Sequence, residues 1–112
     1  MDLGAVKYLT KIETQCAHYA NDPSAALECV TSYYVTVKTS TDASDVYTDV
    51  CFTDPSCPQL FVGNSAASSS NLDLIAANEF DWLVAARFVR LSPQDFIYWP
   101  TMRWEVYGCD YY

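Results

Sequence analysis

Glycine, histidine and basic residues are all scarce in this chain of 112 residues. Three glycines leave little room for a phosphate-binding loop, and the single histidine, His18, would have to be the base for any serine or cysteine nucleophile. Cys16 lies two residues before His18, but half of a disulfide bond is the better interpretation of that cysteine. We therefore expect that the protein is not an enzyme and needs no cofactor.

The six Lys and Arg residues are outnumbered by fourteen Asp and Glu, which gives a net charge of −8. This balance argues against a basic patch that would hold nucleic acid or an anionic membrane, so no nucleic-acid partner is expected. No apolar run approaches the ~20 residues that are needed to span a bilayer. The first residues, Met1 and Asp2 followed by an amphipathic run, also lack the pattern of a secretory signal.

Four aspartates, Asp42, Asp45, Asp49 and Asp54, raise the question of a calcium site. Their spacing differs from that of an EF-hand loop, which needs a central glycine and a glutamate at its twelfth position. We interpret them as residues that cap turns and keep a strand edge soluble. No metal is expected.

Apolar and aromatic residues are plentiful, at 51% and 15% of the chain, so a folded core is expected. A chain of this length forms one domain and can bury about two thirds of its unfolded surface. Alternation of apolar and polar residues predicts strands in three runs. Within 30–38, Thr31, Tyr33, Val35 and Val37 should lie on one face, and Val30, Ser32, Tyr34 and Thr36 on the other. The other two runs are 86–91 and 102–107, and turn-rich segments between them suggest a sandwich or jelly roll.

Five cysteines in so short a chain suggest an oxidising compartment. Cys16 and Cys29 enclose a segment of fourteen residues, and a disulfide between them would stabilise the fold by about 3 kcal/mol. Cys51 and Cys57 bracket a tight turn and could close a second loop, which leaves Cys109 over. The alternative is that all five are buried thiols in a cytosolic protein.

Five stretches of the chain are informative together: Asp2-Leu3-Gly4, Val30–Val35, Phe61–Asn64, Ala85–Gln94 and Met102–Cys109. In this order they resemble the discoidin domain, also called the coagulation factor 5/8 C-terminal (F5/8 type C) domain. The resemblance implies an all-β, antiparallel jelly roll or β-sandwich of the galactose-binding-domain-like type. A full discoidin domain has strands before its Asp-Leu-Gly motif, so residues 1–109 would be an N-terminally truncated domain and 110–112 a tail.

The resemblance also implies details that the pattern alone does not give. In the family the last cysteine pairs with one at the first position of the domain, so Cys109 would be unpaired because its partner lies upstream. Arg87 and Arg103 would be structural, paired with carboxylates such as Asp81 or Glu105. Asn64 and Asn78 would be turn residues. Residues 72–87 could form an amphipathic helix, but the family favours a strand over 72–76, a turn over 78–82 and another strand.

In this family, loops at one end of the barrel hold the ligand, because rigid strands fix the positions of variable side chains. The resemblance places two such loops, at residues 16–29 and 95–100. Phe96 stands where the family has an inward-facing tryptophan and is expected in the core. The predicted ligand-binding residues are His18, Tyr19, Asp22 and Leu27 in the first loop and Tyr98 and Trp99 in the second, although the last two could instead shield the barrel end.

The function implied is that of a non-catalytic binding or adhesion module, extracellular or at the cell surface, as part of a larger protein. Family members bind phospholipid head groups, galactose-type glycans, collagen or the C-termini of proteins. Neither loop contains Lys or Arg, so an anionic membrane is a less favoured partner than a glycan or an extracellular protein. The remaining alternative is a truncated structural fragment with no ligand of its own, which would self-associate through an exposed sheet edge.

Overall fold

The computed structural model describes residues 1–18, 27–51, 57–65, 74–100 and 102–110. Every regular element in this part of the chain is a β-strand, which confirms the all-β prediction. Within the same residues there is no helix of the length and apolarity that a membrane crossing requires. The strands are β1 (Asp2–Gln15), β2 (Ala17–His18), β3 (Leu27–Lys38), β4 (Thr48–Asp49), β5 (Phe61–Val62), β6 (Ala76–Ile97) and β7 (Arg103–Asp110).

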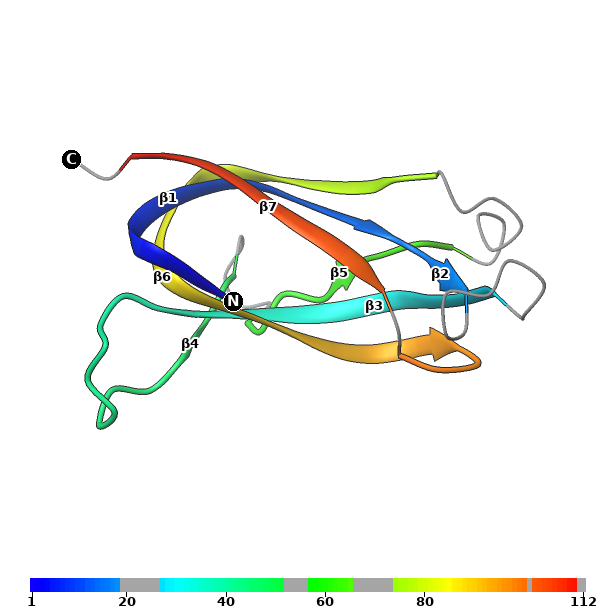
Figure 1. Ribbon diagram of the computed structural model, residues 1–112, viewed down its shortest axis with the longest axis horizontal. Coiled ribbons are helices and arrows are strands. Elements are labelled where there is room, and N and C mark those ends of the chain that lie inside the picture. The colour runs from blue at the N-terminus through cyan, green and yellow to red at the C-terminus, as the bar shows by residue number, and fades with distance from the viewer. Residues whose placement is uncertain (19–26, 52–56, 66–73, 101, 111–112) are drawn as a thin grey trace.

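The long strand β6 joins the two layers of the fold (Figure 1). Up to Phe88 it pairs with β1, and from Phe88 onward it pairs with β3. The strand order is β2-β3-β6-β1-β7, and β4 and β5 also pair with β3. All of these pairings are antiparallel. Because β6 and β1 both curve, one continuous sheet folds over itself into a sandwich-like body; a jelly-roll topology stays a prediction.

The predicted alternation in β3 holds for only part of the strand. Tyr33, Val35 and Val37 are buried as expected, but Val30 and Ser32, predicted on the opposite face, are buried too. The pairing of β3 with β6 shifts register on both sides of Ser32. An irregularity of this kind changes which side chains face inward, so a strict period of two does not persist along the strand.

The core lies between the layers and is built around aromatic contacts. Tyr33 in β3 stacks on Phe61 in β5 with ring centroids 5.6 Å apart, and Phe61 contacts Phe80 in the first half of β6 at 5.9 Å. Burial of these rings excludes water from both layers at once. Aliphatic side chains fill the rest, with Leu9, Ile12, Val30, Val35, Val37, Val50, Ala86 and Val89 all buried.

The turn predicted over 78–82 does not exist, because β6 runs without interruption from Ala76 to Ile97. Asn78, which suggested the turn, pairs with Ile12 of β1. Its side-chain amide donates hydrogen bonds to the Tyr33 hydroxyl at 2.9 Å and to the Val62 carbonyl at 2.8 Å. A residue type typical of turns is thus used for a cross-layer contact, and the helix alternative is also wrong over residues 76–87.

The turn between β3 and β4 agrees with the role expected of the aspartates. The backbone amide and the hydroxyl of Ser44 both donate to the Asp42 carboxylate at 2.9 Å. These hydrogen bonds, the backbone one first, lower the pKa of Asp42. Asp42 therefore caps a turn. At the other end of the chain Asp110, predicted as the start of a tail, is the last residue of β7 and its side chain pairs with Lys7 at 2.7 Å.

Candidate functional site

The two segments predicted to bind ligand lie at the same end of the sandwich (Figure 1). β2 and β3 form a hairpin in which His18 pairs with Leu27. Two residues further along β3, Cys29 pairs with Ile97, the last residue of β6. The residues that follow β6 therefore emerge beside the hairpin. We call this region the loop end.

Four of the six predicted ligand-binding residues thus come together at the loop end. The sequence signal that placed them was the resemblance to the discoidin domain. Two others, Tyr19 and Asp22, lie outside the described residues. The four that are described are His18, Leu27, Tyr98 and Trp99.

Tyr98 and Trp99 are held in a tight turn that exposes both rings. The Trp99 amide donates to the Ile97 carbonyl at 2.9 Å, and Tyr98 between them has a φ of 66°. This φ is uncommon for a residue other than glycine, and such strain is often found at functional sites. Tyr98 is 70% exposed and Trp99 is 63% exposed. Rings exposed to this extent are available to contact a ligand.

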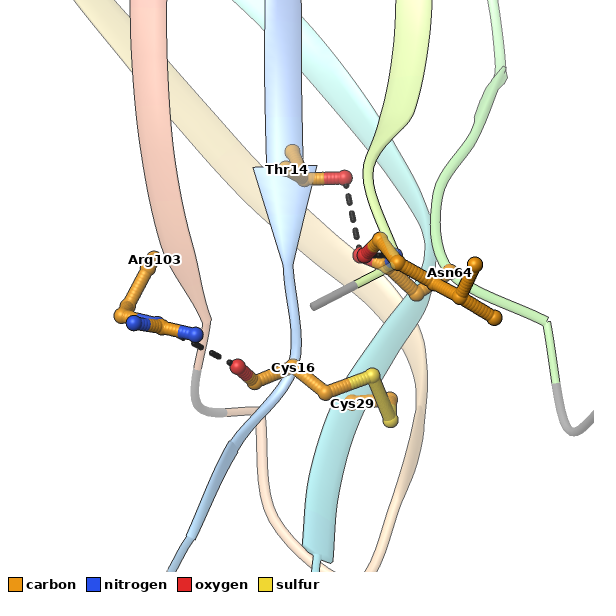
Figure 2. The surroundings of a disulfide bond; sticks show 6 residues. Thr14, Cys16, Cys29, Asn64 and Arg103 are labelled. Carbon is orange, nitrogen blue, oxygen red and sulfur yellow. Dashed lines mark hydrogen bonds between the residues drawn. A yellow bond between two sulfur atoms is a disulfide. The ribbon is translucent and has the colours of Figure 1, made fainter. Parts of the chain in front are cut away.

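A disulfide fixes the base of the hairpin at the loop end. Cys16 and Cys29 are bonded, with their Cα atoms 4.4 Å apart, as the spacing predicted. The Arg103 Nε donates to the Cys16 carbonyl at 3.4 Å (Figure 2). The start of β7 is thereby tied to the hairpin. The second predicted disulfide, Cys51–Cys57, is also formed.

A buried polar contact supports the same region from inside. The Thr14 hydroxyl lies beside the side chain of Asn64 and donates to it (Figure 2). Asn64 also donates to the Leu74 carbonyl at 3.2 Å through its side chain and to the Val30 carbonyl at 3.0 Å through its backbone. It was interpreted from sequence as a turn residue, yet it is only 2% exposed. Its role is to connect β1, β3 and the residues before β6.

One expectation at this end is wrong. Phe96 was expected in the core but is 48% exposed. It lies within β6, which ends at Ile97 and therefore includes the first three residues of the predicted loop 95–100. Near Phe96 the β3–β6 register shifts, so the inward phase of an ideal strand does not apply. Elsewhere in the fold, Arg87 forms a structural ion pair with a carboxylate, as expected, and the partner is Asp2: the Arg87 Nε lies 3.2 Å from the Asp2 carboxylate.

The chemistry available at the loop end is that of recognition. Residues 16–29 and 95–100 contain no Lys or Arg, so the exposed aromatic rings lie in neutral to acidic surroundings. No group of three His, Cys, Asp or Glu side chains among the described residues is placed to hold a metal ion. Apolar rings beside polar backbone suit a ligand with both apolar and hydrogen-bonding faces.

One surface feature near the loop end was not identified from sequence. A hollow of about 160 Å³ lies on the outer face of β1 and β7, lined among others by Glu13, Gln15, Arg103 and Glu105. Alternation in 102–107 predicted a strand with Arg103 and Glu105 on the same face. The strand that would lie beside β7 could not be predicted, so the four side chains could not be assigned to one site.

Comparison with known proteins assigns no family to the chain. No family model matches it, and a search of curated proteins finds no match either. The resemblance to the discoidin domain accordingly enters the functional argument as a proposal that depends on the quoted residues. The two disulfides are compatible with an extracellular protein.

Proposed function

We propose that the protein is a discoidin-like, non-catalytic binding or adhesion module of the extracellular space or cell surface, and that it recognises a glycan or protein ligand at the loop end. The observation that carries this proposal is the exposure of two adjacent large aromatic rings, Tyr98 and Trp99, in a strained turn beside a disulfide-anchored hairpin. Large aromatic side chains are the residue types that most often dominate binding surfaces.

Several properties of the loop end favour a glycan or protein over an anionic membrane. A lipid-binding tip needs basic residues, each contributing about 1 kcal/mol near the surface. The two segments carry none. A rigid aromatic ring loses little conformational entropy when it binds, so a site built from Tyr98 and Trp99 suits the face of a sugar or an apolar side chain.

The test compares wild-type protein with the double variant Tyr98→Ala and Trp99→Ala on a glycan array and on immobilised collagen. Loss of two exposed anchor rings should weaken any binding by about tenfold or more. The control is Val46→Ala, because Val46 is 81% exposed and lies in the connection between β3 and β4, at the opposite end of β3 from Leu27. Binding that survives the double variant would refute a role for the loop end.

The structure also favours a second candidate, association through a sheet edge. β7 pairs with β1 on one side, and among the described strands nothing pairs with its other side. Unpaired edge strands are templates for pairing with another chain. Cys109, which is free and exposed near the end of β7, could add a covalent link.

Sedimentation velocity over a range of protein concentrations tests this second candidate. Association through the β7 edge should increase with concentration and persist in Cys109→Ser, whereas association through the thiol should disappear in that variant and on reduction. A single monomeric species at every concentration would contradict edge pairing and leave ligand binding as the function to pursue.

A further inference from the structure

The outer face of β1 and β7 presents an ordered double row of polar side chains. In this antiparallel pair, Gln15 lies opposite Arg103 and Glu13 lies opposite Glu105. Residues between them in each strand, such as Thr14, face the core. Side chains directly opposite on one face have Cβ atoms about 5 Å apart, so these four can contact one small ligand together.

These side chains border the hollow of about 160 Å³. At ~30 Å³ per water molecule, its volume corresponds to about five waters, which is the scale of a single sugar ring. Ile75 lies at one side of it and Tyr107 at another, and Ile75 is 54% exposed. The hollow therefore combines two apolar surfaces with hydrogen-bonding groups of both kinds.

The charges around the hollow balance. Glu13 and Glu105 are offset by Arg103 and by Lys11, whose Nζ lies 3.4 Å from the Glu13 carboxylate. A site with no net charge gives no preference to an anion or to a cation. It does offer carboxylate acceptors beside guanidinium and amide donors, which is what a neutral, multiply hydroxylated ligand requires.

Part of this hydrogen-bonding capacity is unused. In the described residues the side chains of Gln15 and Glu105 have no hydrogen-bond or ion-pair partner. Glu105 also lies opposite the carboxylate of Glu13 in the neighbouring strand. Like charges directly opposite each other destabilise the pairing of the two strands. A ligand hydroxyl that donates to Glu105 would stabilise this carboxylate beside the second negative charge.

Other groups in the hollow are already fixed in place. The Tyr107 hydroxyl is hydrogen-bonded to Glu13, which raises the pKa of Tyr107 and keeps the phenol protonated. Lys11 lies over the same ring at 4.4 Å from its centroid, and Arg103 is held by the Cys16 carbonyl. Groups that are ordered before binding lose less entropy on binding.

From this geometry we propose that the hollow between β1 and β7 is a subsite for one neutral sugar residue, with Glu105 and Gln15 as its main hydrogen-bonding groups. The inference rests on the proposed binding function, since it names glycan as the ligand class. It extends that function because the subsite lies outside the predicted loops. Gln15 directly precedes Cys16 and Arg103 starts β7, so a glycan bound at the loop end could continue into the hollow.

The experiment is a titration of ¹⁵N-labelled protein with free galactose, glucose and mannose, followed by amide chemical shifts. Shifts should concentrate at Gln15, Arg103 and Glu105, with a Kd on the order of 1 mM, as expected for a small polar ligand. Glu105→Ala should weaken binding about tenfold. Asp45→Ala is the matched control, because it removes an exposed carboxylate in the connection between β3 and β4 and should leave binding unchanged.

Charged analogues test the neutrality of the site. Glucuronate, which adds a carboxylate, and glucosamine, which adds an ammonium group, should both bind more weakly than glucose. Equal or tighter binding of either would overturn the proposal of a neutral subsite. Gln15→Ala serves as a second variant, so the outcome does not depend on how well Glu105→Ala folds.

The outcomes separate this inference from the proposed function. Shifts confined to Tyr98 and Trp99, and lost in the Tyr98→Ala, Trp99→Ala variant, would overturn the subsite while supporting the loop end. Shifts at the hollow that persist in that double variant would support the subsite by itself. No shift at the hollow with any of the three sugars overturns the subsite, whatever the glycan array shows for the loop end.

Discussion

The Thr14 hydroxyl donates a hydrogen bond of 3.0 Å to the side-chain oxygen of Asn64, and both residues are buried. Since Asn64 also bonds to β3 and to the residue Leu74 before β6, this contact lies where three segments meet. An unmade hydrogen bond costs more in such a place than at the surface, because water cannot replace the missing partner.

Thr14→Val should lower the free energy of unfolding by about 1–3 kcal/mol, because it keeps the shape of the side chain but leaves the Asn64 oxygen without its donor. Urea unfolding measures the change. The control is Thr10→Val on the same strand, whose hydroxyl donates to the Tyr107 carbonyl at an exposed position. If the two variants lose equal stability, the buried contact has no special role.

The second prediction concerns Tyr33, which is fully buried and whose pKa is raised by burial to about 12. Below about pH 10 the hydroxyl is protonated in both states, so the folded protein has its full stability. Between about pH 10 and 12 the unfolded state ionises while the folded state keeps its proton, and stability falls by up to about 3 kcal/mol.

Urea unfolding at several values between pH 8 and pH 12 measures this dependence. Tyr33→Phe should remove most of the decrease relative to wild type at each pH, since phenylalanine has no proton to lose. Asn78 keeps its bond to the Val62 carbonyl in that variant, so its amide is not left without an acceptor. An unchanged pH profile in Tyr33→Phe would assign the decrease to other groups.

The third prediction concerns the two disulfides. Removing the Cys16–Cys29 bond by double serine substitution should cost about 3 kcal/mol, and removing Cys51–Cys57 about 2 kcal/mol, because the first closes the longer loop. Alkylation followed by intact mass measurement of the native protein should find one free thiol, at Cys109. Five free thiols in a stable monomer would contradict both bonds.

Several features of the fold could be predicted because they depend on local patterns. Alternation predicted a strand over 102–107, and β7 begins at Arg103 and includes the rest of that run. Cysteine spacing predicted both disulfides. These signals are local because a strand's alternation and a short loop's closure depend on residues near each other in the chain.

Features that depend on which strands meet could not be predicted in this way. Asn78 is typical of a turn, yet its amide bonds to two other strands and the chain stays extended around it. The subsite proposed on β1 and β7 depends on Glu13 lying opposite Glu105, residues 92 positions apart in sequence (105 − 13). A register shift of one residue in either strand would have moved them to different faces.

The last prediction concerns Gly108, which lies where β7 passes closest to β1. A Cβ atom at this position would meet the carbonyl group of Tyr8, which belongs to the backbone and cannot turn away. Gly108→Ala should therefore force β7 away from β1 and lower the free energy of unfolding by about 1–3 kcal/mol. Glu105→Ala on the same strand is the control for stability alone, because its side chain is exposed and its removal leaves the backbone in place. For sugar binding the control is Asp45→Ala, as above. The displaced strand should also widen the hollow, so Gly108→Ala should weaken sugar binding there while leaving binding at Tyr98 and Trp99 intact. Equal stability of Gly108→Ala and wild type would show that β7 can shift without cost, and the preorganisation argued for Tyr107 and Arg103 would then fail.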